Sequence, residues 1–139
     1  MSRILWIAPH NIHLEPIIGG LESLGQHEIC IHWLGNNGFP VDRGMLNEAD
    51  RFNPNIIIYT GENGGYLVPS IGTLIALKKM APTVFMCHDA SDVTWTRFLN
   101  DYHAYDVFSV IVNIDGSNDW PKGPNDITAL TPHDQRFYE

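Results

Sequence analysis

Six short apolar runs, each ending at a polar or glycine-containing cluster, constrain the fold of this chain more than any other feature. Most of them are continuous rather than alternating, which is typical of parallel strands covered on both faces. Loops that leave the carboxyl ends of such strands line one crevice, where ligands bind. We therefore expect the chemistry of this protein to gather along one edge of a sheet. The runs are Ile4–Ala8, Ile29–Trp33, Ile56–Tyr59, Thr83–Cys87, Phe108–Val112 and Ile127–Leu130.

Segments with helical periodicity separate these runs. Residues 14–24 place leucine and isoleucine three and four positions apart, and Gly25 is placed to end that helix. Asp42, Ser70 and Asp92 are the expected N-caps of three further helices. The repeated strand–helix–strand order predicts an α/β fold, a Rossmann-like three-layer sandwich with an open, mainly parallel six-stranded sheet.

The composition indicates one globular domain, and we predict a single domain over residues 1–139. The net charge is −8, from 16 acidic and 8 basic residues, which argues against nucleic acid or an anionic membrane as a partner. No apolar run approaches the roughly 18 residues of a membrane span, and the first run is too short for a secretory signal. Cys30 and Cys87 fall in expected strands and are interpreted as reduced core residues. Together these features predict a cytoplasmic protein.

Signatures of nucleotide and cofactor binding are missing. The chain has no Walker A sequence, and the glycine-rich stretch 61–65 does not satisfy G-x-G-x-x-G. We therefore predict neither a cofactor nor a bound metal.

His88 and Asp89 form the sharpest candidate site, because they leave a strand just before a helix at the centre of the expected crevice. A neutral imidazole there can take a proton from a hydroxyl group, and a carboxylate can orient it. We predict both as catalytic residues. The structural alternative is that His88 packs and Asp89 caps the helix, the role that we assign to Asp92.

Further polar residues follow the other strands and are predicted to bind substrate. His10, Asn11 and His13 stand before the first helix, whose N-terminus can hold an anion. Glu62 and Asn63 follow the third strand, although their glycine-rich loop is also explained by a tight turn. Asp115 follows the fifth strand, where a strand-terminal turn is likewise sufficient.

Five segments resemble, in the same order, the N-terminal domains of GT-B glycosyltransferases, and the stretch from Ser70 to Asp92 is most similar to the CgeB-like and group 1 enzymes. The shared features are the Gly-x-His-Glu step into the second strand, the Pro-Asn-Ile-Ile step into the third and the His-Asp end of the fourth. The segments are Arg3–Ala8, Gly25–Ile29, Asn53–Ile58, Pro82–Asp89 and Leu130–Asp134.

This resemblance implies the acceptor-side half of a two-domain hexosyltransferase. The expected partners are then a C-terminal domain that binds the nucleotide-sugar and a sugar or glycan acceptor, and the chain alone is expected to show no turnover. His88 and Asp89 match the family's His-Asp pair, whereas Gly19 and Gly20 do not match its Gly-Gly loop.

Two alternatives come from other classes. The Ala-Pro-His opening resembles that of zinc-dependent LmbE-like deacetylases, and His10, His13 and Asp89 are its conceivable ligands, but the adjacent acidic pair of that family is missing. The other alternative is a non-catalytic flavodoxin-like module with a regulatory or scaffolding role. It lacks the paired acidic residues that phospho-receivers carry after the first strand.

Overall fold

Strands and helices alternate along the chain in a computed structural model that describes residues 2–9, 14–34, 41–61, 68–88 and 90–129. The elements are β1 (Ser2–Ala8), α1 (Leu14–Ser23), β2 (His27–Trp33), α2 (Val41–Phe52), β3 (Ile56–Gly61), α3 (Ile71–Met80), β4 (Thr83–Cys87), α4 (Val93–Ala104), β5 (Val110–Asn113) and β6 (Ile127–Thr128).

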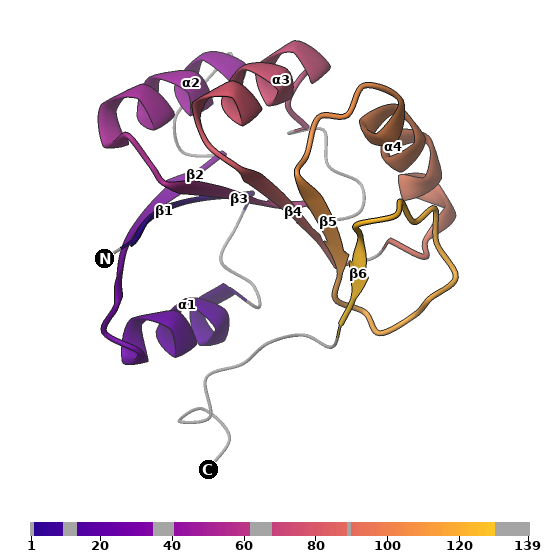
Figure 1. Ribbon diagram of the computed structural model, residues 1–139, viewed down its shortest axis with the longest axis horizontal. Helices are drawn as coiled ribbons and strands as arrows, with labels where there is room; N and C mark the ends of the chain where they lie inside the picture. The colour runs from indigo at the N-terminus through magenta and orange to yellow at the C-terminus, as the bar shows by residue number, and fades with distance from the viewer. Residues whose placement is uncertain (1, 10–13, 35–40, 62–67, 89, 130–139) are drawn as a thin grey trace.

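All six strands belong to one sheet with the order β2-β1-β3-β4-β5-β6, and every neighbouring pair is parallel. The first five strands follow the flavodoxin-like order, in which the direction of the chain across the sheet reverses between β1 and β3. Helices α2, α3 and α4 lie on one face, and α1 lies on the other (Figure 1). The predicted α/β class and the open parallel six-stranded sheet are confirmed.

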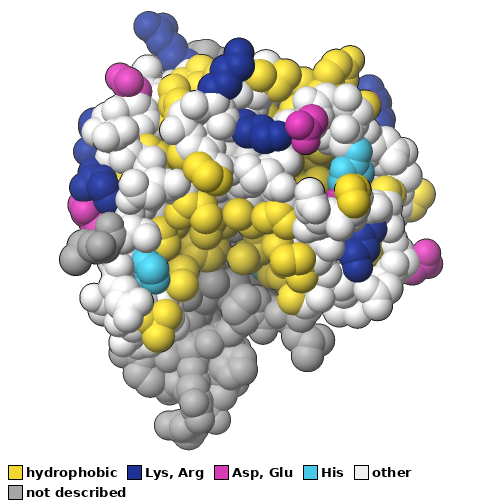
Figure 2. Space-filling model, viewed as in Figure 1, with side chains coloured by type: hydrophobic (Ala, Val, Ile, Leu, Met, Phe, Trp, Pro, Cys, Tyr) yellow, Lys and Arg dark blue, Asp and Glu magenta, His cyan; other side chains and the backbone are white. Residues whose placement is uncertain are grey.

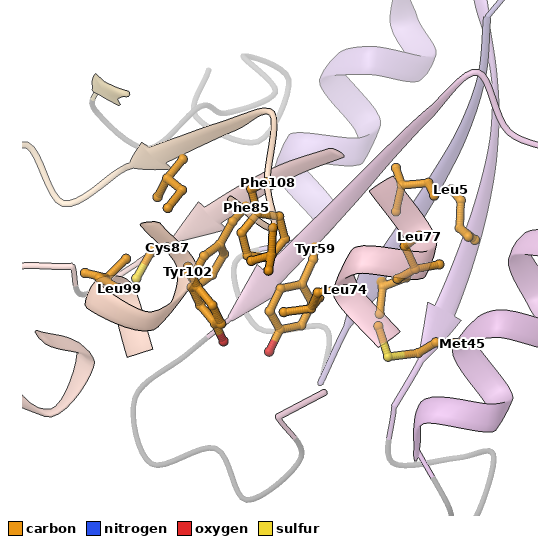
Figure 3. Packing of buried hydrophobic residues seen from close by; sticks show 14 of the residues in the cluster. Leu5, Met45, Tyr59, Leu74, Leu77, Phe85, Cys87, Leu99, Tyr102 and Phe108 are labelled. Atoms are coloured by element: carbon orange, nitrogen blue, oxygen red, sulfur yellow. The ribbon is translucent and has the colours of Figure 1, made fainter. Parts of the chain in front are cut away.

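The larger core lies between the sheet and helices α2, α3 and α4 (Figure 3). Its centre is aromatic: the ring of Phe85 lies 5.3 Å from that of Trp95, 5.4 Å from that of Tyr102 and 5.1 Å from that of Phe108. Trp95 and Tyr102 therefore belong to the core, as their helical spacing predicts. Such rings contribute most through the large apolar area that they bury.

A smaller core lies on the α1 side of the sheet, around the fully buried Trp6 and Ile18. The indole nitrogen of Trp6 donates to the hydroxyl of Thr60 at 2.7 Å, which satisfies both polar groups inside this core. Val84 and Met86 on β4 are only partly buried here. Figure 2 shows hydrophobic side chains gathered across the middle of the viewed face.

Three of the four predicted helix boundaries are confirmed. Ser70 is the N-cap of α3 and accepts from the Thr73 amide, and Asp92 caps α4 by accepting from Thr94. Gly25 follows α1 with φ +65°, a left-handed conformation that glycine adopts without a steric penalty. The expected cap at Asp42 is wrong: α2 already begins at Val41, and the Asp42 carboxylate accepts from the Ser70 amide at 2.9 Å.

The boundaries of two strands also differ from the apolar runs. Strand β5 begins at Val110, and Phe108, the first residue of the predicted run, packs its ring against Phe85 in the aromatic core. Strand β6 contains only Ile127 and Thr128, and Leu130 lies outside the described residues. Among the helices that the structure describes, none is long and apolar enough to cross a membrane.

Candidate functional site

The carboxyl ends of β3, β4 and β5 lie side by side, since Gly61 pairs with Cys87 and Cys87 pairs with Asn113. Strand β1 ends at Ala8 on the other side of β3, one residue beyond its Ile7–Tyr59 pair. In parallel α/β sheets, ligands bind outside this edge at the point where the strand order reverses. The described part of this edge is therefore the candidate functional site.

Asn113 organises the polar groups at this edge. Its side chain is fully buried at the end of β5 and donates to Asp115 Oδ1 at 2.6 Å and to the Ser117 carbonyl at 2.8 Å. Its own amide oxygen accepts from the backbone N–H groups of Ala90 and Asp115 at 3.4 and 3.3 Å. One buried amide thus ties the loop after β4 to the loop after β5.

Asp115 completes this arrangement from the exposed side. Its carboxylate accepts from the Ser91 hydroxyl at 2.8 Å and from the Ser117 backbone N–H at 2.7 Å, in addition to the Asn113 amide. Partial burial raises the pKa of Asp115, but the hydrogen bonds from Ser117, Ser91 and Asn113 outweigh it and hold this pKa below its usual value. Asp115 is therefore an ionised acceptor at neutral pH. We call the four residues Ser91, Asn113, Asp115 and Ser117 the edge frame.

Gly61 brings the end of β3 into close contact with the aromatic core. A Cβ atom at this position would lie 2.8 Å from Phe85 Cε1 and 2.9 Å from Trp95 Cη2. Because contacts this short do not occur between packed atoms, only glycine fits here without displacing the rings. The end of β3 is thus packed directly against Phe85 and Trp95.

Two of the predicted site residues lie at this edge. His88 follows β4 and is half-buried, and Asp115 belongs to the edge frame. Their proposed catalytic and substrate-binding roles stay predictions. The other six, His10, Asn11, His13, Glu62, Asn63 and Asp89, lie outside the described residues.

The zinc alternative finds no ligand cluster in the described ranges. No group of three His, Cys, Asp or Glu side chains in this part of the chain could hold a metal ion. All three of its conceivable ligands lie outside those ranges: His10, His13 and Asp89.

Sequence reasoning missed Asn113, Ser91 and Ser117. Asn113 ends an apolar run, so its burial was not visible in the pattern, and the Ser91 contact joins residues 24 positions apart. The available signal was the spacing Asn113-x-Asp115-x-Ser117, since Asn, Asp and Ser side chains bind backbone groups two residues away. That spacing predicts a turn but not its tie to β4.

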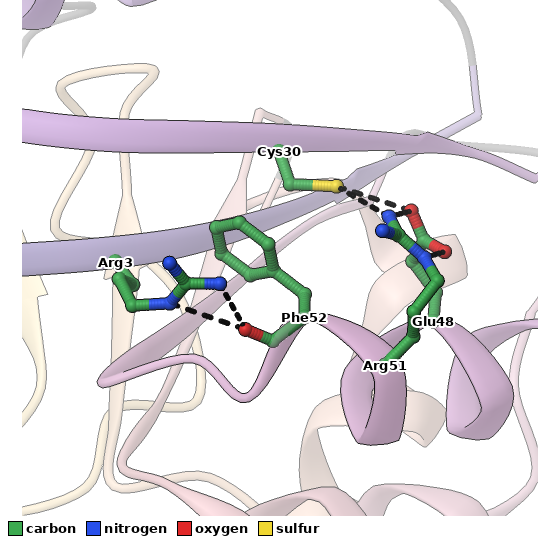
Figure 4. A network of polar contacts seen from close by, with 5 residues as sticks. All are labelled: Arg3, Cys30, Glu48, Arg51 and Phe52. Carbon is green, nitrogen blue, oxygen red and sulfur yellow. Dashed lines mark hydrogen bonds and ion pairs between the residues drawn. The ribbon is translucent and has the colours of Figure 1, made fainter.

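A second polar cluster joins β2 to α2 (Figure 4). The Cys30 thiol contacts Glu48 Oε1 at 3.1 Å, and Arg51 binds the same carboxylate through Nε at 3.0 Å and through its terminal nitrogen at 2.8 Å. Burial, followed by the Glu48 hydrogen bond, raises the pKa of Cys30 to about 11. Both cysteines are free thiols, and Cys30 is not activated as a nucleophile, because a nucleophilic cysteine needs a lowered pKa.

A groove of about 480 Å³ lies away from this edge, between the last turn of α4 and the loop before β6. His103 is held there by the Pro121 carbonyl at 3.1 Å and by Asp126 at 3.3 Å. Asp126 also accepts from the Ile111 and Gly123 amides. These contacts hold the loop before β6 against α4 and β5, so we assign them a structural role.

No protein-family model and no curated protein sequence matches this chain. A solved structure of similar fold is that of RcsB from Salmonella enterica serovar Typhimurium, bound to promoter rprA in the presence of the phosphomimetic BeF3-. The TM-score is 0.57 and the identity is 14%, over 85% of this chain and 55% of that one. At this identity the likeness shows the fold alone, and this chain spans about half of the length of RcsB.

The resemblance to GT-B glycosyltransferases is therefore wrong, because the structural match is to RcsB and nothing in the comparisons supports a sugar transferase. Two of the segments that carried it, Arg3–Ala8 and Asn53–Ile58, have structural roles, whereas Leu130–Asp134 lies outside the described residues. Asn55 Oδ1 accepts from the Arg3 backbone N–H at 2.7 Å, and Asn53 adopts a left-handed turn at φ 53°. Such strand-entering steps recur wherever a helix is followed by a parallel strand, so they identify the fold class and not the enzyme.

The predicted partners are wrong together with the predicted transferase activity. A nucleotide-sugar domain and a sugar acceptor have no support. The predicted exclusion of nucleic acid is also contradicted, since RcsB, which is similar to this chain over 55% of its length, is bound to promoter DNA. A net charge describes the whole surface, whereas a partner is bound by one patch or by another part of a longer protein.

Proposed function

We propose that this chain is a non-catalytic flavodoxin-like module with a regulatory or scaffolding role, which binds a protein partner at the carboxyl edge of its sheet. The edge frame is the observation that carries the proposal. Its polar groups bind one another: Asp115 accepts from Ser91, Asn113 and Ser117. A general acid or base needs a lone pair or proton that faces the substrate, and Asp115 uses its oxygens to hold two loops together.

The fold supports the same reading. The strand order is flavodoxin-like, and the likeness to RcsB favours the regulatory alternative over a transferase. The residues after β1 read Pro9-His10-Asn11-Ile12-His13 and contain no acidic pair, so we expect control by binding and not by phosphorylation. A module of this kind presents loops on a rigid sheet, which is how such scaffolds carry recognition residues.

The predicted edge residues enter this proposal as contacts to the partner. His88 lies at the edge beside the edge frame, and His10, Asn11, His13, Glu62 and Asn63 are placed by the sequence after β1 and β3. One domain over residues 1–139 and a cytoplasmic location complete the proposal.

A thermal-shift screen tests the non-catalytic part. The panel contains nucleotide-sugars, FMN and Mg²⁺ with BeF3-, each at high concentration. A ligand at 100 times its Kd stabilises a protein by about 2.7 kcal/mol, which raises Tm by several degrees in a domain of this size. We expect no shift. A shift with a nucleotide-sugar that is lost in His88→Ala would overturn the proposal.

Affinity capture tests the partner-binding edge. A protein captured by the wild-type chain should be lost with Asp115→Arg and retained with Asp119→Arg, because both aspartates are exposed but only Asp115 belongs to the edge frame. Equal retention by both variants would place the partner elsewhere and reject the carboxyl edge as the binding surface. Circular dichroism at matched temperature confirms that both variants are folded.

A further inference from the structure

The loop over residues 121–126, just before β6, is held in one shape by a buried carboxylate. The Asp126 side chain is only 7% exposed, and it accepts from the Ile111 and Gly123 backbone N–H groups at 2.9 and 2.8 Å. The same carboxylate lies 3.3 Å from His103 Nε2. One side chain therefore fixes this loop to β5 and to α4 in the absence of any ligand.

The contact between this loop and α4 leaves no room for a further side chain. A Cβ atom on Gly123 would lie 2.9 Å from His103 Cε1 and 3.0 Å from Asp126 Oδ2. His103 Nε2 also lies 3.1 Å from the Pro121 carbonyl. Since carbonyl and carboxylate oxygens only accept, Nε2 is a protonated nitrogen that donates to the loop. With two prolines of fixed φ, Pro121 and Pro124, this loop is a preorganised wall.

The groove between this wall and the last turn of α4 is therefore formed before binding. Its volume of about 480 Å³ lies within the range of about 300–1,000 Å³ that is typical of ligand pockets. Phe108, which is 7% exposed, gives the groove an aromatic base, and Pro121 and Pro124 line the side of the loop. A ligand that enters does not first have to order the loop, which favours affinity.

The charged groups around the groove are largely compensated. Lys78 binds the Asp106 carboxylate at 3.1 Å, and His103 contacts Asp126. Lys122 makes no ion pair within the described ranges, but its side chain is exposed and solvated. The groove thus offers little uncompensated charge to an ionic ligand.

Neutral hydrogen-bonding groups, in contrast, are available. Asn100 of α4 and Asn125 of the loop line the groove from its two sides, and neither side chain makes a hydrogen bond to a described residue. The Ser109 hydroxyl accepts from the Thr83 N–H at 3.0 Å and keeps its own proton to donate. A primary amide donates and accepts in one plane, as a peptide group does, so the two asparagines match the main chain of a peptide.

We propose that this groove binds an extended, uncharged peptide segment of a partner protein. The side chains of Asn100 and Asn125 pair with main-chain N–H and C=O groups of the segment, and one of its apolar side chains covers the ring of Phe108 between the two prolines. The groove lies away from the carboxyl edge. It is therefore a second contact surface, beyond the function proposed above.

Nuclear magnetic resonance of the full chain tests the proposal, because the side-chain NH2 signals of asparagine report directly on these two groups. The probe is the blocked dipeptide N-acetyl-Pro-Leu-amide, titrated through the millimolar range. We expect saturable shifts of the Asn100 and Asn125 NH2 signals and of backbone amides in the loop over residues 121–126. Glucose, acetate and methylguanidinium are the comparison ligands and should produce none. No saturable shift with the dipeptide, or equal shifts with a comparison ligand, would overturn the proposal.

Substitutions at exposed positions locate the binding. Asn100→Ala and Asn125→Ala should each weaken the dipeptide about fivefold, which corresponds to one lost hydrogen bond of ordinary strength. Asn118→Ala makes the same change at an exposed asparagine outside the groove and should not weaken it. Equal affinity of all three variants would place the peptide elsewhere. A loss of binding with Lys122→Gln would show recognition of an anion and would likewise reject the uncharged segment.

Discussion

Replacement of Asn113 by alanine tests whether the edge frame holds the carboxyl edge together. The change deletes the two hydrogen bonds that the side-chain amide donates, at 2.6 Å to Asp115 and 2.8 Å to the Ser117 carbonyl. It also removes the oxygen that accepts from the Ala90 backbone N–H. Asn113 has no exposed surface, so alanine opens a small void and leaves the backbone N–H of the buried Ala90 without its acceptor.

The structure sets the size of the effect. The two hydrogen bonds that the Asn113 amide donates, at about 1 kcal/mol each, together with the cost of the unsatisfied Ala90 N–H, lower the free energy of unfolding by about 3 kcal/mol. At about 3 °C per kcal/mol for a domain of this length, Tm should fall by about 10 °C. Ser91→Ala removes one hydrogen bond to Asp115 and should cost about 1 kcal/mol.

Urea unfolding followed by circular dichroism measures both variants, with Asn100→Ala, an exposed position of α4, as the control. The control should stay within about 0.5 kcal/mol of the wild type. The double variant of Ser91 and Asn113 should cost less than the sum of the two, since both act on Asp115. If Asn113→Ala matches the control, the edge frame does not stabilise this edge and the reasoning is refuted.

Three further outcomes follow from single contacts. Thr60→Val keeps the shape but leaves the Trp6 indole N–H without its 2.7 Å acceptor, so it should cost about 1–3 kcal/mol in urea unfolding, whereas Thr60→Ser should cost less. Gly61→Ala places a Cβ 2.8 Å from Phe85 and should cost about 1–3 kcal/mol, and an unchanged midpoint would contradict the close packing. The pKa of Glu48 is lowered from 4.5 to about 2, chiefly by the hydrogen bond from its arginine neighbour on α2. A carboxylate with a lowered pKa in the folded state stabilises the protein at pH values above its pKa in the unfolded chain, and this stabilisation is lost as the pH falls through the folded-state pKa. At pH 7 the free energy of unfolding of the wild type should therefore exceed that of Glu48→Gln by about 1 kcal/mol, after solvent screening, and the difference should disappear as the pH falls toward 2.

The elements that were predicted correctly share one property: their signals are local. The apolar run from Thr83 to Cys87 is the observed β4, and Ser70 and Asp92 cap helices because a cap contacts amides only two or three residues away. The prediction at Asp42 failed for the opposite reason. Its carboxylate binds the Ser70 amide, 28 residues away, and no local pattern contains that information.

At the candidate site, too, the local features could be predicted and the long-range contacts could not. The sequence predicts that polar residues such as His88 and Asp115 follow strands, and parallel pairing brings their strands to one edge. It does not predict that Asp115 is held by Ser91 and Asn113, because that depends on which strands become neighbours. The mistaken transferase prediction has another origin: strand-entering segments such as Asn53–Ile58 recur wherever a helix is followed by a parallel strand, so they do not identify an enzyme.

By itself, the sequence determined a parallel α/β sheet, since runs of apolar residues interrupted by amphipathic helices can bury their surface in few other ways. Only the tertiary structure decided the strand order, which places β2 at one edge of the described sheet, and the partners of Asn113. The physical reason is that the periodic spacing of apolar residues along the chain predicts which of them are buried. The partner of a polar group, by contrast, depends on side chains that folding brings together from distant positions.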